Sequence, residues 1–253
     1  MVLSWELATV GVIATGILAI AAVLAGALTW PAGLLAAVFG SVIVILAGFP
    51  FLVLLVLFVA ASSLATRYAF REKQRQKVQE GRSGERGISN VLAHIVVPMG
   101  LVLVATGFPA AIPPATLAFL YACAIAFGAA DTFASEFGVL TGHARSILDL
   151  RPVTPGTNGG VSVLGELWGF VGAAATAVVG WWAFVAFGAP EPMAALVIAG
   201  VIVAGFAACQ VDSLVGAVLE NPGYIGKGGT NLLGMVSAVL IGLLLLRVGG
   251  VPW

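Results

Sequence analysis

Two acidic residues, each followed by a hydroxyl residue, interrupt long apolar stretches of the sequence. The pairs are Asp131-Thr132, within AAFGAADTFASEFG, and Asp212-Ser213, within AACQVDSLVGAVLE. An ionisable side chain at the end of a bilayer-length segment is costly unless it has a partner or a function. Carboxylates that lie beside a bound phosphate usually need a divalent cation, because the negative charges would otherwise repel each other. Mg²⁺ prefers one or two carboxylates together with substrate oxygens and water. Asp131 and Asp212 are therefore the leading candidates for a shared Mg²⁺ site.

Further polar side chains follow the first acid. On a helix, Ser135 is four residues from Asp131 and nearly aligned with it, whereas Glu136 lies to one side. We interpret Ser135, like Thr132 and Ser213, as a hydroxyl that binds substrate. Glu136 is predicted to be a third metal ligand or a general base, and its structural alternative is a charge held at the membrane interface.

A glycine-rich segment follows each acid-hydroxyl pair and precedes an apolar run. The segments are PGTNGGVSVLG, with Gly156, Thr157, Asn158, Gly159 and Gly160, and GKGGTNLLG, with Lys227, Gly228, Gly229 and Asn231. Glycines before a helix allow backbone N–H groups to converge on an anion, and the helix N-terminus adds the positive end of its dipole. Each segment therefore predicts a phosphate-binding site, in which Lys227 supplies a point charge. The alternative is an ordinary turn and helix cap.

The order of helix, acid, glycine-rich segment and helix thus occurs twice. In both copies a Gly-Gly pair is followed five residues later by another glycine, from Gly160 to Gly165 and from Gly229 to Gly234. We interpret this as a degenerate parallel repeat. Repeats in membrane proteins commonly place the functional site at the interface between the copies.

Composition identifies the elements that must position these residues as membrane helices. Of the 253 residues, 60% are hydrophobic and only 9% are charged, whereas soluble domains average about 25% charged residues. The formal net charge of zero argues against a nucleic-acid partner, which requires a basic surface. The expected fold is an all-α transmembrane domain over residues 1–253, with eight spans, or seven if the second and third form one re-entrant unit. The predicted spans are 7–28, 33–47, 51–66, 91–107, 114–130, 161–187, 193–211 and 232–248.

The basic residues predict how these spans are oriented in the cell membrane. The chain divides into N-terminal spans at 5–66, a basic segment at 67–89 and motif-bearing spans at 90–248. Seven of the 11 Lys and Arg residues lie between Arg67 and Arg86. With eight spans, this segment and both motif loops share one side, which the positive-inside rule makes cytoplasmic, with both termini outside. Within the basic segment, Arg71–Lys77 is expected to be a solvated helical extension.

Arg86 and Asn90 stand just before the fourth predicted span. They are four residues apart and share a face if the helix has already begun there. Arg86 is then a candidate for neutralising phosphate charge. Asn90 is either a phosphate-binding residue or an ordinary N-cap.

The segments SGERGISNVLA, DTFASE, PGTNGGVSVLG, VDSLVGA and TNLLG together resemble motifs of an integral membrane family. This family contains the phytyl-phosphate kinase of plant vitamin E synthesis, and the resemblance runs from about residue 82 to residue 240. The matching positions are Asp131, Ser135, Glu136, Gly156, Gly159, Gly160, Asp212, Ser213 and Asn231. The sequence departs from the pattern at Asn158, where the family often carries Asp, and at His94, where Asn is expected.

The resemblance implies magnesium-dependent transfer of a phosphoryl group to a prenyl monophosphate, giving the diphosphate. Related polyprenol kinases are similar in using CTP, so the implied donor is CTP or another nucleoside triphosphate. The layout suits this reaction, because an isoprenoid tail lies in the bilayer while its phosphate and the nucleotide meet at the bilayer edge. Transfer needs mostly positioning and charge neutralisation, for which Lys227 and Arg86 are candidates. A monophosphate acceptor is already anionic and needs no general base.

A transporter or flippase of an anionic lipid or small anion is the competing interpretation. Carriers also show internal repeats, intramembrane polar residues and glycine-interrupted helix starts. They differ in needing a site near the bilayer midplane with access from both sides. The sequence leaves the prenyl chain length and the oligomeric state open, including a homo-oligomer.

Overall fold

The computed structural model describes residues 4–79, 81–187 and 194–249. Within these residues it contains eight helices that are long and apolar enough to span a membrane, which confirms the predicted helical membrane fold. They are α1 (Trp5–Leu24), α2 (Trp30–Ala47), α3 (Phe49–Arg67), α5 (Ile88–Gly107), α6 (Pro114–Gly138), α7 (Val163–Ala186), α8 (Ala194–Val215) and α9 (Lys227–Val248). Between α3 and α5 lies a short helix, α4 (Phe70–Gln76). The predicted start of the seventh span, residue 193, falls outside the described residues.

The second and third spans are separate helices. Gly48 divides α2 from α3 with a φ of 101°, a conformation that favours glycine, and a proline stands in the first turn of each helix. The two helices have 18 and 19 residues, which is close to the length needed to cross the hydrocarbon core. The seven-span alternative with a re-entrant unit is therefore not supported.

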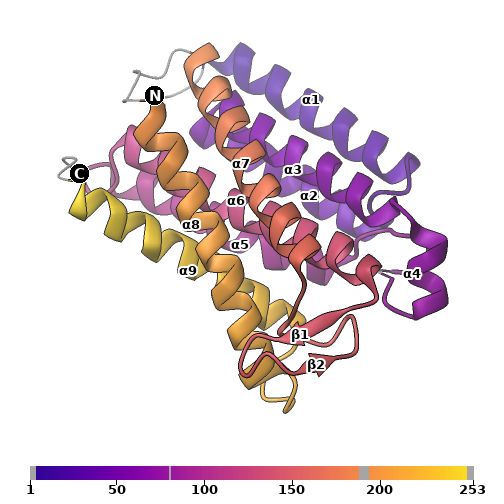
Figure 1. The fold of residues 1–253 in the computed structure, drawn as a ribbon. Helices are drawn as coiled ribbons and strands as arrows, with labels where there is room; N and C mark the ends of the chain where they lie inside the picture. The colour runs from indigo at the N-terminus through magenta and orange to yellow at the C-terminus, as the bar shows by residue number, and fades with distance from the viewer. Residues whose placement is uncertain (1–3, 80, 188–193, 250–253) are drawn as a thin grey trace.

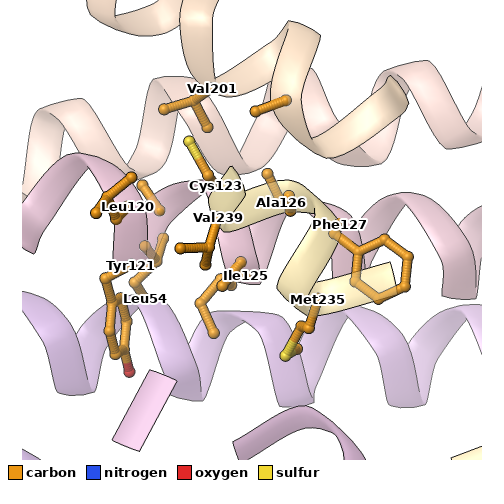
Figure 2. Close-up of a cluster of buried hydrophobic side chains, with 14 of the residues drawn as sticks. Leu54, Leu120, Tyr121, Cys123, Ile125, Ala126, Phe127, Val201, Met235 and Val239 are labelled. Carbon is orange, nitrogen blue, oxygen red and sulfur yellow. The ribbon is translucent and has the colours of Figure 1, made fainter. Parts of the chain in front are cut away.

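Helix α6 is the centre of the bundle and packs against α3, α5, α7, α8 and α9. Of its most apolar 18 residues, 78% are buried, compared with 11% for α1. Small residues allow this close packing. A Cβ atom on Gly172 of α7 would lie 2.7 Å from the Ala129 carbonyl oxygen, and one on Gly205 of α8 would lie 2.7 Å from the Ala126 Cβ. Figure 2 shows the resulting core, in which Tyr121 and Phe127 of α6 are surrounded by side chains of the neighbouring helices.

The two ends of the bundle differ. The start of α1 and the end of α9 lie at one end, while α4, the strands and the turn between α8 and α9 lie at the other (Figure 1). The basic segment and both motif loops therefore share one side, as the even number of intervening spans predicts. That this side is cytoplasmic stays a prediction.

Three helix boundaries next to the predicted site residues differ from the predicted ones. Helix α6 continues past residue 130 to Gly138, and α8 continues past residue 211 to Val215, where a π-helix, η2 (Gly216–Glu220), follows. Helix α9 begins at Lys227, five residues before the predicted residue 232. The predicted spans ended at the first polar residue, but a polar side chain does not by itself end a helix, because its backbone still makes the helical hydrogen bonds. Asp131 and Asp212 consequently lie inside helices and not at their ends.

The loop between α6 and α7 contains regular structure that was not predicted. After a 3₁₀ turn, η1 (Val139–Thr141), the chain forms β1 (Ala144–Ser146), β2 (Pro152–Val153) and β3 (Gly160–Val161). These strands form an antiparallel sheet with β1 in the middle. Strands of two or three residues are too short for the alternation of polar and apolar residues to reveal them.

Candidate active site

A cavity of ≈ 190 Å³ lies at the loop end of the bundle, among α6, α7, α8, η2, α9 and the first glycine-rich segment. Most of the predicted site residues line it: Asp131, Ser135, Glu136, Gly156, Thr157, Asn158, Gly159, Gly160, Asp212, Ser213, Lys227 and Asn231. The two copies of the repeat therefore meet at one cavity. Five predicted residues lie outside its lining: Arg86, Asn90, Thr132, Gly228 and Gly229.

Asp131 and Asp212 face this cavity from α6 and α8. The charge of Asp212 interacts with those of Asp131, Glu220 and Lys227. Its Oδ1 atom is buried and has no hydrogen-bond partner among the described residues. Helix α9 approaches this atom at Gly234, where a Cβ would lie 2.9 Å from Oδ1. Two neighbouring carboxylates, one with an unbonded oxygen, form a donor set that fits Mg²⁺.

Glu136 makes contacts that compete with its predicted roles. Its Oε2 accepts a hydrogen bond from Lys73 Nζ at 2.7 Å, and its Oε1 accepts one from Thr66 Oγ1 at 2.7 Å. In the described ranges, no group of three His, Cys, Asp or Glu side chains is arranged to hold a metal ion. Because both Glu136 oxygens already accept hydrogen bonds from protein groups, we assign the metal to Asp131 and Asp212 alone, and the roles expected of Glu136 stay predictions.

The first glycine-rich segment does not have the predicted helix-capping geometry. Gly160 belongs to β3, and its N–H group donates to the Thr157 carbonyl at 2.8 Å. Helix α7 begins only at Val163, and its first turn is capped by Ser162 Oγ, which accepts from the Gly165 N–H at 3.1 Å. The N–H group of Gly160 and the start of α7 are thus bound within the protein, so the predicted three-glycine cradle is not formed here.

The glycines of this segment instead allow close packing. Gly156 and Gly159 have φ angles of 86° and 74°, which side chains disfavour. A Cβ on Gly159 would lie 2.5 Å from the Ala217 Cβ and 2.7 Å from the Ser213 carbonyl oxygen. The segment therefore forms a wall of the cavity that is pressed against η2 and the end of α8. A π-helix next to a functional site is a common association.

The second glycine-rich segment forms the first turn of α9 and is not a loop before it. Lys227 is the first residue of the helix, and its N-cap is Gly226, which has no side chain to accept from the first N–H groups. The N–H group of Gly229 donates to the Gly226 carbonyl at 2.8 Å. A helix start that lacks a capping side chain retains the positive end of the helix dipole. Of the two predicted cradles, this one keeps the features that bind an anion.

Arg86, Asn90 and Thr132 form a hydrogen-bonded cluster beside the cavity, in which Arg86 and Thr132 are buried and Asn90 is half-buried. Arg86 donates to Asn90 Oδ1 at 3.1 Å and to Thr132 Oγ1 at 3.4 Å. Because Thr132 directly follows Asp131 on α6, this cluster lies next to the cavity on an adjacent face of the helix. Asn90 is not an N-cap, since α5 begins at Ile88 after Gly87.

Three contributions to the site were not predicted. Lys73 was expected to be solvated but is fully buried against Glu136. Val78 lines the cavity from the basic segment. Gln210 of α8 donates to Glu166 of α7 at 2.8 Å and joins these helices at the cavity. A single lysine within a basic stretch carries no sequence signal that separates it from its solvated neighbours.

These features define a polytopic α-helical membrane protein with a carboxylate-lined cavity at one end of its bundle. Residues 13–230 match the family described as Integral membrane protein DUF92, and the chain belongs to this family. It is 30% identical over 210 residues to an uncharacterized membrane protein of Methanocaldococcus jannaschii, covering 82% of this chain and 81% of that protein. It is 31% identical over 213 residues to the Protein PGR of Arabidopsis thaliana, covering 72% and 71% of the two chains. An uncharacterized membrane protein of Synechocystis sp. is 34% identical over 176 residues, covering 68% and 63%. No solved structure matches the chain.

Proposed function

We propose that the protein transfers a phosphoryl group from a nucleoside triphosphate, such as CTP, to a prenyl monophosphate in the membrane. The observation that carries this proposal is the presence of Asp131, Asp212 and Lys227 in one cavity at the loop end of the bundle. The choice of a prenyl acceptor comes from the sequence resemblance. The cavity position suits such an acceptor, because its apolar tail would remain in the bilayer.

Different residues of the cavity would have different roles in phosphoryl transfer. Asp131 and Asp212 would hold Mg²⁺, which when bound neutralises phosphate charge and orients the phosphate oxygens. Lys227 and the start of α9 would bind the donor phosphates. The hydroxyl groups of Ser135 and Ser213 would donate hydrogen bonds to phosphate oxygens. Such preorganised charges and donors account for most of the catalysis in phosphoryl transfer.

The contacts of Glu136 favour an acceptor that is already ionised. An alcohol acceptor would require a general base, whereas a monophosphate attacks through an existing anionic oxygen. Since Glu136 is bonded to Lys73 and Thr66, it is poorly placed to remove a proton. Phosphate monoester and diphosphate chemistry therefore fits this cavity better than phosphorylation of a free prenyl alcohol.

The packed centre of the bundle weighs against the transporter alternative. A carrier needs a path from its site to the other side of the membrane. Below Asp131, the α6 residues Tyr121, Ile125 and Phe127 are all 0% exposed, and they pack with α3, α8 and α9 (Figure 2). Polar groups are concentrated at one end, as an enzyme acting at the bilayer edge requires.

The proposal is tested with purified protein in detergent and in liposomes. Prenyl monophosphates of several chain lengths are incubated with each of the four nucleoside triphosphates, with Mg²⁺ or with EDTA. We expect a prenyl diphosphate product that requires Mg²⁺. Absence of product with every donor and acceptor would refute the proposal. Nucleotide-independent movement of a fluorescent prenyl phosphate across the liposome bilayer would support the flippase instead.

A further inference from the structure

The segment between α3 and α5 contains a lysine whose environment differs from that of its neighbours. Lys73 of α4 is 0% exposed, whereas Arg71, Arg75 and Lys77 in the same segment are exposed. Burial of an ammonium group is costly unless the charge is paired and its protons are hydrogen-bonded. A lysine whose only role was to add positive charge to this segment could remain exposed to water.

Lys73 joins three helices through its ammonium group. Its Nζ atom donates to Glu136 Oε2 of α6 at 2.7 Å, and to the carbonyl oxygens of Ala65 and Thr66 at 2.9 and 3.2 Å. Ala65 and Thr66 belong to the last turn of α3, where carbonyl groups lack partners within the helix. Lysine side chains commonly bind such terminal carbonyls. The ammonium therefore fastens α4 to the end of α3 and to the cavity helix α6.

The same lysine fixes the position of Val78 through its backbone. The Val78 N–H group donates to the Lys73 carbonyl at 3.0 Å. The Val78 side chain lines the cavity and packs on the first glycine-rich segment. A Cβ on Gly156 would lie 2.7 Å from Val78 Cγ1. Contacts therefore run without interruption from Glu136 through Lys73 and Val78 to the glycine-rich wall.

The backbone on both sides of α4 depends on these contacts. Ala69 and Lys77, which flank the helix, have φ angles of 50° and 59°. Non-glycine residues adopt this left-handed conformation at a cost, and it persists only where the surrounding structure enforces it. The segment would therefore rearrange if the ammonium group were removed.

We propose that Lys73 is a positioning residue that holds residues 68–79 as one wall of the cavity and, through Val78, fixes residues 156–160. The claim about substrate rests on the proposed function: because residues 156–160 form a wall of the cavity in which the acceptor phosphate would lie, Lys73 sets the affinity for the prenyl monophosphate. Lys73 itself does not touch the reacting atoms in this proposal.

Hydrogen exchange measured by mass spectrometry tests the structural claim without any activity. In Lys73→Met we expect peptides covering 68–79 and 144–161 to exchange at least about tenfold faster, because the second region contains the Gly160 N–H and Ile147 N–H hydrogen bonds. Arg75→Met removes the same charge from an exposed position of α4 and should change neither peptide. Unchanged exchange in 144–161 of Lys73→Met would overturn the proposal.

A second variant covers the case in which Lys73→Met does not fold. Removing only the lysine leaves the Glu136 carboxylate buried without its cation, which is strongly destabilising. Lys73→Met combined with Glu136→Gln removes both charges. The same faster exchange in residues 144–161 is expected for this double variant, and normal exchange there would equally overturn the proposal.

Steady-state kinetics test the claim about substrate. Lys73→Met should raise the KM for prenyl monophosphate about tenfold, while kcat stays within about threefold and the nucleotide KM is unchanged. If exchange responds but this KM does not, Lys73 is a structural anchor and not a positioning residue. If the protein shows no phosphoryl transfer at all, the proposed function fails, and the exchange experiment still decides whether Lys73 holds the wall.

Discussion

The two copies of the repeat use similar sequences to build different structures around one cavity. Between α6 and α7, the glycine-rich segment passes through β3 and is packed against η2. Between α8 and α9, the corresponding glycines form the first turn of a helix. The acids remain equivalent, since Asp131 and Asp212 both line the cavity from within a helix.

The difference assigns separate tasks to the two copies. In the first copy, the Gly160 N–H and the first turn of α7 are hydrogen-bonded within the protein. In the second copy, α9 begins after a glycine, with Lys227 at its first position. A Gly-Gly pair in both motifs therefore does not show that the two segments bind a ligand in the same way. Substitutions at matching positions of the two copies should separate these tasks.

Replacement of either aspartate should lower kcat more than any other substitution. The loss should be similar for the two copies of the repeat. We expect Asp131→Asn and Asp212→Asn each to lower kcat by roughly 10²–10³-fold or more, because each removes a charge that we propose to hold Mg²⁺. The melting temperature should stay equal or rise, since the two carboxylates repel each other. Asp149→Asn, in an exposed ion pair with Arg151, is the control. An active Asp212→Asn enzyme with unchanged magnesium dependence would refute the shared site.

Lys227→Ala should affect the donor more than the acceptor. Loss of a charge-assisted contact of about 1.5–3 kcal/mol, with any transition-state contribution, should lower kcat/KM for the nucleotide roughly 10–1,000-fold. Gly160→Val should instead raise the KM for the prenyl phosphate, because even a Cβ there would lie 2.8 Å from the Thr157 carbonyl oxygen. The exposed Arg151, replaced by Ala, is the control. If Lys227→Ala affected only the prenyl phosphate and Gly160→Val only the nucleotide, the donor would bind at the first glycine-rich segment instead.

Much of the architecture could be predicted because the bilayer sets the length of each apolar segment and the side on which basic residues gather. Eight spans and the gathering of both motif loops at one end follow from these constraints alone. Helix ends were harder, since Asp131 and Asp212 look like boundaries in a sequence. In the structure, both lie within helices and line the cavity.

Local contacts of the site were the part that the sequence could not provide. Lys73 and Glu136 are separated by 63 positions, and no spacing rule connects them. The hydrogen bonds that bind the Gly160 N–H group come from a turn and a small sheet, which have almost no periodic signal. Residue type predicted which side chains line the cavity better than it predicted what each of them contacts.

Alanine substitutions at matching glycines of the two segments should change stability in different ways, because one glycine is needed for close packing and the other lies in an open helical turn. Gly159→Ala should lower stability by roughly 1–3 kcal/mol, because the residue has a φ of 74° and its new Cβ would collide with Ala217. A Cβ added to Gly228 would have no neighbouring atom within 4 Å, so Gly228→Ala should be neutral or stabilise α9 by up to about 1 kcal/mol. Unfolding in detergent micelles measures both. Equal losses would mean that the two segments are packed alike.

The smallest effects should come from the helix caps, where the two copies differ most clearly. Ser162→Ala removes the α7 cap and should cost about 0.5–2 kcal/mol, with no change in nucleotide affinity. Gly226 has an extended backbone and open space around its Cα, so Gly226→Ser should add a cap to α9 and gain a few tenths of a kcal/mol. The new hydroxyl would occupy N–H groups that we assign to the donor phosphates. The increase in melting temperature on adding nucleotide should therefore be smaller in Gly226→Ser than in the parent protein. An undiminished increase would show that the start of α9 does not bind the donor.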